Sequence, residues 1–347
     1  MTRRITLKDV AREAGVHVST ASRALNPATS AVVNPETLSR VSDAARRLGY
    51  RPHPLARGLR TNQTMSIGMV IPDVENPLFG PIVAGAESVL VEEGYSVLIG
   101  NADRGPDQAE SVVADMLERH VDGLILATAS RHNAQMNGAD GLGVPVVLVN
   151  RTVDDESVPS ILGDDRAGIG LAVRHLADLG HERIGHVAGP SWVSTGAGRR
   201  EAFLHWMDEV GLKAPPEVVE EAEWYQVEPG HNAARALLDR VPDLTAIVAA
   251  NDLLGLGCYR AIADRGRRVG TDVSVTGYND IPLLDMMQPP MTSVRVPYRE
   301  MGSRAAATLL SLIAGEDSPG IIHLPPSLAV RASTAPPPGL ESGSQAG

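Results

Sequence analysis

Short apolar runs alternate with longer amphipathic segments along most of this 347-residue chain, from Ser66 onward. This alternation is typical of parallel β-sheets with helices on both faces, because parallel strands need long crossover connections. The expected strands are Ser66–Ile71, Tyr95–Gly100, Gly123–Ala127, Val144–Val149, Arg183–Ala188, Thr245–Ala250 and Val273–Gly277. The expected helices are Leu78–Glu93, Pro106–Arg119, Arg166–Leu179, Gly198–Val210, Gly230–Arg240, Leu253–Arg265 and Tyr298–Ile313. The strands divide into a set ending near Asn150 and a set starting near Ile161, which predicts two doubly wound lobes.

The N-terminal segment is typical of two short helices joined by a tight turn. Thr6 is expected to cap the first helix, with Asp9 three residues later as its partner in a capping box. Gly15 ends that helix, because glycine adopts the left-handed conformation at little cost. Either His17 or Ser19 starts the second helix. The pattern predicts a helix-turn-helix, whose second helix fits the major groove of DNA.

The second of these helices carries small polar side chains on its outward face. The residues of this segment expected to contact DNA are Thr6, His17, Val18, Ser19, Thr20, Ser22, Arg23 and Asn26. Taken alone, two ordinary amphipathic helices at the start of an enzyme explain the same pattern equally well.

Charge separates the N-terminal segment from the rest of the chain. The first sixty residues hold eleven Lys and Arg against four Asp and Glu, a net charge of +7, whereas the whole chain carries −11. The remaining residues therefore carry −18. A basic head before an acidic body suits a module that neutralises DNA phosphates while its partner domain is repelled by them.

These motifs resemble the head of the lactose-repressor (LacI/GalR) family of bacterial transcription regulators. The resemblance rests on Thr6-Leu-Lys-Asp-Val-Ala, Ala14-Gly-Val and Ser19-Thr-Ala-Ser-Arg-Ala-Leu-Asn26, and on Asn34-Pro35 as the cap and first residue of a third helix. It implies an all-α helix-turn-helix head at residues 1–50, a hinge at 51–62 and an α/β core at 63–334. That core would be periplasmic-binding-protein-like, with two doubly wound parallel-sheet lobes. The Pro-, Gly- and Ser-rich residues 335–347 are expected to form a disordered tail.

The resemblance also assigns roles in the hinge. Leu59 is expected to wedge into the minor groove of the DNA, next to a contact from Arg60. Gly58 departs from the helix-favouring residues common at that position, and glycine costs roughly 1 kcal/mol relative to alanine within a helix. We therefore expect the hinge to be disordered without DNA, and Gly58→Ala to tighten DNA binding and blunt the response to a ligand.

Polar residues follow the predicted strands of the core, at the ends where open α/β sheets bind ligands. The resemblance implies that a small effector is bound by Asp73, Asn76, Phe79, Asn150, Arg151, Thr195, Arg199, Tyr225, Asn251 and Asn279. Each of these also fits a helix cap or an ordinary loop residue, but their recurrence at successive strand ends favours a site. In the family's topology, Thr292–Arg295 is expected to return to the first lobe and complete a hinged cleft.

The expected site departs from sugar-binding relatives, which usually carry Asp where Asn150 and Asn279 stand here. The cleft therefore lacks two carboxylates and keeps two positive charges, on Arg151 and Arg199. Because a guanidinium pairs bidentately with carboxylate or phosphate, an anionic effector such as a phosphosugar or sugar acid is expected. A neutral sugar remains open, since arginine also donates to hydroxyls and an aromatic side chain at residue 224 or 225 can stack on a sugar ring.

Other functional classes fit less well. The core has no dinucleotide-binding glycine motif after a strand, no Walker A motif and no nucleophile elbow, so we expect neither an enzyme nor a cofactor. The histidines at 175, 181 and 186 are spread over a helix, a turn and a strand, which does not favour a metal site. The single cysteine, Cys258, suits a reducing cytoplasm, and no apolar run approaches the ~18 residues of a membrane span.

The sequence thus predicts a cytoplasmic, homodimeric transcription regulator of the repressor type, without contact to a membrane. Its partners would be a palindromic double-stranded DNA operator and a small sugar-like effector. The alternative is a cytoplasmic sugar-binding protein without DNA function, against which the basic head and the missing signal peptide argue. No leucine heptads follow Ile313, which does not favour a tetramer.

Overall fold

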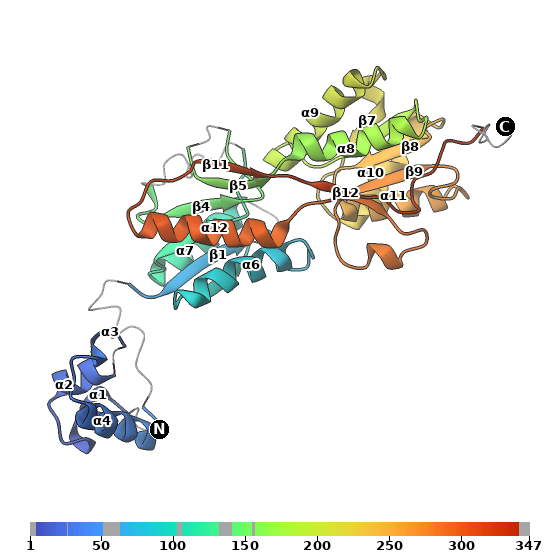
Figure 1. Ribbon diagram of the computed structural model, residues 1–347. Coiled ribbons are helices and arrows are strands. Elements are labelled where there is room, and N and C mark those ends of the chain that lie inside the picture. Colours follow the sequence, from blue (N-terminus) through green and yellow to red (C-terminus); the bar gives the residue numbers. More distant parts are fainter. Residues whose placement is uncertain are drawn as a thin grey trace, which may run out of the picture. The chain divides into compact units, whose positions relative to one another are not determined.

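The computed structural model describes residues 5–25, 27–50, 63–102, 106–131, 141–154 and 157–339 (Figure 1). The chain divides into two compact units, Met1–Met65 and Ser66–Gly347. Asn26 and the predicted hinge at 51–62, with Leu59 and Arg60, lie outside the described residues, as does most of the predicted tail. Ala335, the first residue of that tail, is described and its backbone N–H donates to Ser274 Oγ at 3.1 Å.

The first unit is a small helical domain. Its helices are α1 (Leu7–Glu13), α2 (Val18–Ala24), α3 (Pro27–Ser30) and α4 (Pro35–Leu48). The predicted capping box starts α1, with Thr6 N donating to Asp9 Oδ2 at 2.9 Å. Gly15 follows α1 with a φ of 64°. His17 caps α2, because its Nδ1 accepts from Ser19 N at 3.3 Å.

Small apolar side chains form the core of this unit. The buried members are Val10, Ala11, Ala14, Ala21, Ala24, Val41, Ala44 and Ala45. They lie on the inward faces of α1, α2 and α4, which is the amphipathic spacing seen in the sequence. Helix α4, which corresponds to the third helix of the prediction, begins after its predicted cap, Asn34, and ends before Gly49, whose φ is 63°. The predicted helix-turn-helix is confirmed.

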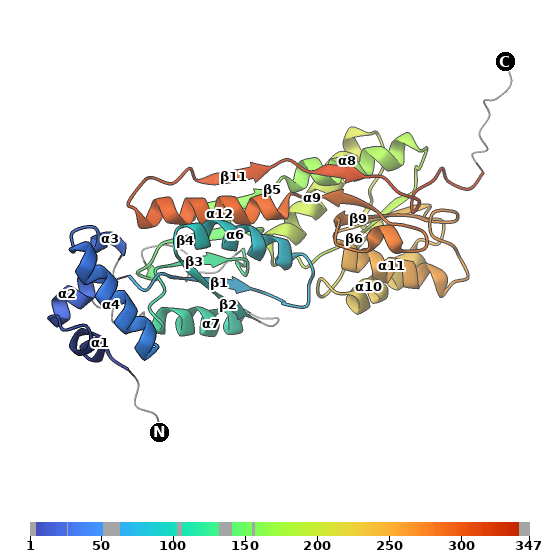
Figure 2. The same cartoon turned by 60° about the horizontal axis from the view of Figure 1, so that its bottom comes forward.

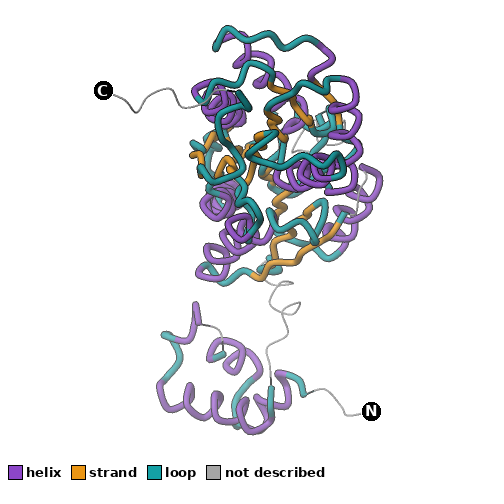
Figure 3. The backbone as a smooth tube through the Cα atoms, turned by 90° about the vertical axis from the view of Figure 1, so that its right-hand side faces the viewer, coloured by secondary structure: helices purple, strands orange, loops and turns teal. Residues whose placement is uncertain are grey.

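The second unit contains two six-stranded sheets, whose strands are enclosed between helices (Figures 1 and 3). The first sheet is parallel throughout, in the order β11-β5-β4-β3-β1-β2. Its strands are β1 (Ser66–Ile71), β2 (Ser96–Asn101), β3 (Gly123–Leu126), β4 (Val146–Val149), β5 (Ser160–Gly163) and β11 (Ile321–Leu324). Helices α6 (Phe79–Glu92) and α12 (Tyr298–Ile313) pack together on one face, and α7 (Pro106–Glu118) covers the other (Figure 2).

The second sheet has the order β12-β10-β9-β8-β6-β7 and is parallel except for β12, which runs antiparallel to β10. Its strands are β6 (Ile184–Ala188), β7 (Val219–Glu221), β8 (Ala246–Ala249), β9 (Ser274–Asn279), β10 (Thr292–Arg295) and β12 (Ser327–Ala329). Its helices are α8 (Asp165–Asp178), α9 (Ser194–Glu209), α10 (Val227–Arg240) and α11 (Asp252–Ala263), with short 3₁₀ turns at Pro216–Val218 and Leu284–Met286. Helix α8 packs on α9, and α10 packs on α11.

Two expectations about the lobes are wrong. Thr292–Arg295 does not return to the first lobe but pairs with β9 in the second sheet, where the buried Ser293 Oγ donates to Asp252 Oδ1 at 2.5 Å. The second set of strands does not start near Ile161, because β5 lies between β4 and β11 in the first sheet. The elements that return to the first lobe are α12 and β11. Within the described residues, the chain thus passes between the sheets after β5, after β10 and after β11.

Candidate functional site

The outward face of α2 is the candidate DNA-binding surface of the first unit. His17, Ser19 and Arg23 are exposed there, and the guanidinium of Arg23 makes no ion pair with any described residue. Val18, which was expected to point outward, is half-buried and packs in part against the core of the unit. The cap role of His17, which the sequence left open, is filled by its Nδ1 atom.

The remaining predicted DNA contacts are less prominent. Thr20 and Ser22 are half-buried on α2, and Thr6 is exposed at the start of α1, where its Oγ1 donates to Asp9 Oδ2 at 2.7 Å. The exposed surface of α2 therefore presents one cation, one imidazole and small hydroxyls. These groups are typical of a recognition helix, since hydroxyls and arginine reach base edges and phosphates.

All ten predicted effector residues line one cleft in the second unit, together with Pro72, Leu78 and Trp224. They lie at or after the carboxyl ends of β1, β4, β6, β7, β8 and β9, with Phe79 at the start of α6 and Thr195 and Arg199 in the first turns of α9. The cleft holds a volume of about 30 Å³, enough for ~two water molecules. The effector role of these residues stays a prediction.

Arg199 is held rigidly in this cleft. Its Nε donates to Asp165 Oδ1 at 2.9 Å, its Nη1 donates to Ala250 O at 2.7 Å, and its guanidinium lies 3.8 Å from the ring centroid of Tyr278. Burial opposes the positive charge, but Asp165 and nearby tyrosines outweigh it and raise the pKa of Arg199. The sequence analysis counted Arg199 as a positive charge of the cleft and missed its partner, because Asp165 follows β5, a strand that it did not predict.

Arg151 has the opposite surroundings. The residue is 7% exposed, its Nε has no hydrogen-bond partner, and no described acid pairs with it. Burial is the main reason that the pKa of Arg151 is lowered to about 10; Tyr225 partly opposes this shift, and the neighbouring charge of Arg199 adds to it. A buried cation without a partner is costly, so this position favours an anionic group from outside the protein.

Three asparagine side chains of the cleft use their carbonyl oxygens internally. Asn251 Oδ1 caps α11 by accepting from Leu254 N at 2.8 Å, and Asn76 Oδ1 accepts from Leu78 N at 3.1 Å. Asn279 Oδ1 accepts from Tyr298 Oη at 2.6 Å, a partner that the sequence analysis did not identify. The cap and site interpretations of these residues are thus compatible, because each amide still has an Nδ2 group to offer a ligand.

Contacts across the cleft complete its wall. Tyr225 Oη donates to Thr195 Oγ1 at 3.2 Å, in space left by Gly189, where a Cβ would meet the phenol oxygen at 2.2 Å. Asp73 from the first lobe accepts from Gln226 Nε2 of the second lobe at 3.4 Å. Asp73 is the one carboxylate among the described residues that line the cleft.

Comparison with known proteins matches both units. A family model described as "Bacterial regulatory proteins, lacI family" matches residues 6–53, and one described as "Periplasmic binding protein-like domain" matches residues 173–334. The HTH-type transcriptional regulator MalR of Streptomyces coelicolor is 36% identical over 346 residues, which cover 96% of this chain and 97% of MalR. The chain belongs to the LacI family.

Solved structures of this family share the whole architecture. The transcriptional regulator CelR–cellobiose complex has a TM-score of 0.73 at 32% identity, covering 95% of this chain and 100% of that one. The lac repressor dimer bound to operator and the anti-inducer ONPF has a TM-score of 0.86 at 29% identity, covering 96% and 100%. The chain is therefore a DNA-binding transcriptional regulator with a periplasmic-binding-protein-like core, and it is not an enzyme.

No described helix is long and apolar enough to cross a membrane. No group of three or more His, Cys, Asp or Glu side chains in the described ranges is arranged to hold a metal ion.

Proposed function

We propose that this LacI-family regulator is a cytoplasmic homodimeric repressor, and that its cleft binds a small sugar-like effector carrying a carboxylate or phosphate. The observation that carries the effector class is Arg151, a buried guanidinium without an ion pair. An anionic ligand group gains about 1.5–3 kcal/mol for each hydrogen bond to a charged donor.

The polar atoms left over in the cleft support the same ligand class. The Nδ2 groups of Asn251, Asn279 and Asn76 are donors, whereas Asp73 alone supplies a carboxylate. A ligand rich in hydrogen-bond acceptors pairs with these donors better than a ligand rich in hydroxyl protons. The sugar-like body is proposed by analogy with CelR, whose solved structure is a complex with cellobiose.

On the DNA side, we propose that two heads read a two-fold-symmetric operator through α2. Arg23, Ser19 and His17 would reach base edges or phosphates, helped by Val18, Thr20, Ser22, Thr6 and Asn26. Leu59 and Arg60 of the hinge would contact the minor groove. The lac repressor structure, a dimer bound to operator, supports the symmetric arrangement.

Calorimetry with a hexose and the same hexose 6-phosphate tests the effector class. We expect the phosphorylated sugar to bind about tenfold or more tightly, and Arg151→Gln to remove most of that difference. Arg268→Gln, which removes an exposed guanidinium far from the cleft, is the matched control and should leave both affinities unchanged. Tighter binding of the neutral hexose to the parent protein would refute an anionic effector.

Fluorescence anisotropy on DNA from the protein's own promoter tests the repressor role. We expect specific binding that weakens steeply with salt and changes when the effector is added. A protein that binds the sugar but neither promoter nor random DNA would instead be the alternative, a sugar-binding protein without DNA function.

A further inference from the structure

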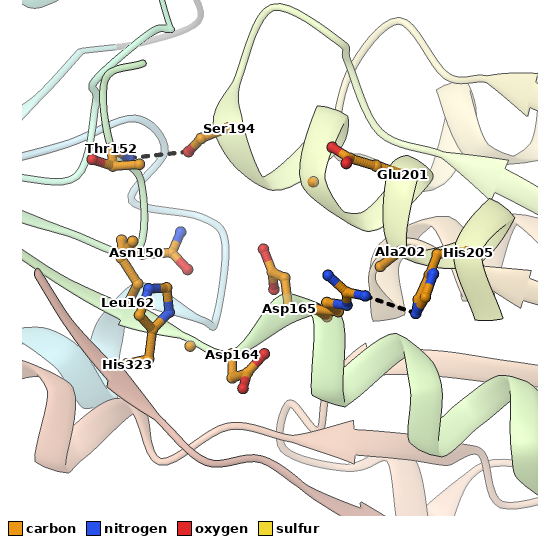
Figure 4. Close-up of a pocket in the computed structure, with 13 residues that line it drawn as sticks. Asn150, Thr152, Leu162, Asp164, Asp165, Ser194, Glu201, Ala202, His205 and His323 are labelled. Carbon is orange, nitrogen blue, oxygen red and sulfur yellow. Dashed lines mark hydrogen bonds between the residues drawn. The ribbon is translucent and has the colours of Figure 1, made fainter. Parts of the chain in front are cut away.

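A second cavity, larger than the effector cleft, lies where the two lobes of the core meet (Figure 4). Its volume is about 330 Å³, which falls within the ~300–1,000 Å³ typical of small-molecule sites. The first lobe contributes the ends of β4 and β5 and His323 of β11, and the second lobe contributes α8 and α9. A ligand here would touch both lobes, so its binding would depend on how they are closed.

The second cavity and the effector cleft are linked by a shared residue and by an ion pair. Asn150 is the one residue that lines both spaces. Asp165 lines the second cavity and Arg199 lines the cleft, and the two are joined by the 2.9 Å ion pair described above. Any group that attracts the Asp165 carboxylate from the cavity side therefore acts directly on an arginine of the cleft.

Carboxylates are the main charged groups around the second cavity. It is lined by the carboxylates of Asp164, Asp165 and Glu201, and Glu201 has no hydrogen bond or ion pair with any described residue. The lining also contains one arginine, Arg166, whose Nη2 lies 2.8 Å from His205 Nε2. The lining is thus more negative than positive even after Arg199 is counted as the partner of Asp165.

Asn150 offers this cavity a polar side chain that is not used inside the described part of the protein. The residue is only 8% exposed and has a φ of 65°, and its side-chain amide makes no hydrogen bond with any described residue. The side chains of Asn150 and Asp165 point toward each other across the cavity (Figure 4). A nearly buried amide without a partner is normally satisfied by a ligand or by water.

We propose that the second cavity binds a small polyhydroxylated amine, of the size and chemistry of an amino sugar. Its ammonium group would lie between Asn150 Oδ1 and the Asp165 carboxylate, in the negative field of Asp164 and Glu201. Its hydroxyls would meet the polar rim at His323, and the apolar surface of the cavity would cover the ring. Since this group competes with Arg199 for Asp165, binding here would alter the arginine that the cleft uses.

Calorimetry on the full chain with D-glucosamine, and with D-glucose as the neutral counterpart, tests the proposal. We expect D-glucosamine to bind about tenfold more tightly than D-glucose, because only its ammonium group pairs with a carboxylate. The double variant Asp164→Asn, Glu201→Gln should lower the D-glucosamine affinity about tenfold. Asn is as good a helix cap as Asp, so α8 keeps its first turn in this variant.

Two further variants make the result decisive. Glu209→Gln, at the far end of α9, removes one negative charge away from the cavity and should leave the D-glucosamine affinity unchanged. Asp73→Asn removes the carboxylate of the cleft and reports binding there instead. Equal affinities for the two sugars, no heat at millimolar D-glucosamine, or a loss with Asp73→Asn but not with the double variant would overturn the proposal. None of these measurements uses DNA, so their failure leaves the proposed repressor function untouched.

Discussion

His186 is expected to make the stability of the second lobe depend on pH. The imidazole on β6 is fully buried and stacks on Phe203 with 4.8 Å between ring centroids. Its Nδ1 lies 2.8 Å from Val248 O and so carries the proton, while Nε2 has no hydrogen-bond partner. Burial lowers the pKa of His186 from 6.5 to about 4.

The sign and size of the effect follow from this shift. Above about pH 6.5 the imidazole is neutral in both the folded and the unfolded chain, and its ionisation does not affect stability. As the pH falls below that value, the unfolded chain binds a proton that the folded chain excludes, until the folded pKa is reached. A shift from 6.5 to about 4 therefore costs ~3 kcal/mol of unfolding free energy across this window.

Urea unfolding followed by tryptophan fluorescence measures this cost, because all three tryptophans, at 192, 206 and 224, lie in the second lobe. Between about pH 7 and pH 4.5, His186→Leu should lose ~2–3 kcal/mol less stability than the parent. The control His323→Leu removes an exposed imidazole and should keep the parent's slope. Identical pH dependence in His186→Leu and the parent would refute the argument.

Three further changes follow from the contacts described above. Arg23→Ala should weaken binding to the specific operator by about 1–3 kcal/mol and binding to random DNA much less, and equal losses in the two titrations would contradict base recognition. Asp165→Asn should lower the unfolding free energy by ~3 kcal/mol by leaving Arg199 buried without its partner, and an additive double-mutant cycle with Arg199→Met would contradict a coupled pair. Gly189→Ala should push the Tyr225 phenol into the cleft and weaken effector binding in calorimetry with unchanged operator affinity; a parent-like effector affinity would show that the phenol moves elsewhere.

The helical head could be predicted almost residue by residue, because its signals are local. The capping pair of Thr6 with Asp9, the left-handed Gly15 and the cap at Asn34 each act within a few residues of themselves. The exception is Val18, which the helical period turns outward but which packs in part on the core of the unit. Only the assembled helices decide that contact.

The lobe assignment of β10 could not be predicted from local pattern. The local sequence of a four-residue strand such as Thr292–Arg295 does not determine which sheet the strand joins. Its neighbours depend on pairing between segments far apart in the chain. Its partner β9 ends thirteen residues earlier, whereas β12 comes from beyond the return to the first lobe. The buried polar residues Thr292 and Ser293 fit there because Arg331 O and Asp252 supply their hydrogen bonds.

In the cleft, the site residues could be predicted from the strand ends, but the charge of the site could not. The rule that ligands lie at the carboxyl ends of strands brought ten predicted residues to one cleft. The charge of the cleft, however, depends on contacts between segments far apart, above all Asp165 with Arg199. With that pair counted, Arg151 is the cation that lacks a described partner.

The internal hydrogen bonds of the cleft decide which ligand chemistry it favours. The carbonyl oxygen of Asn251 caps α11, and that of Asn279 accepts a hydrogen bond from Tyr298. A ligand in the cleft therefore meets the Nδ2 groups of both residues. A neutral sugar hydroxyl that accepts a hydrogen bond from such a donor still needs an acceptor for its own proton. Asp73 is the one carboxylate among the described lining residues that can accept it. Each proton left without an acceptor in a closed cleft costs about 1–3 kcal/mol. A phosphate or carboxylate brings acceptors without surplus protons and also neutralises Arg151, so an asparagine in place of an aspartate here changes the preferred charge of the ligand as well as its hydrogen bonding.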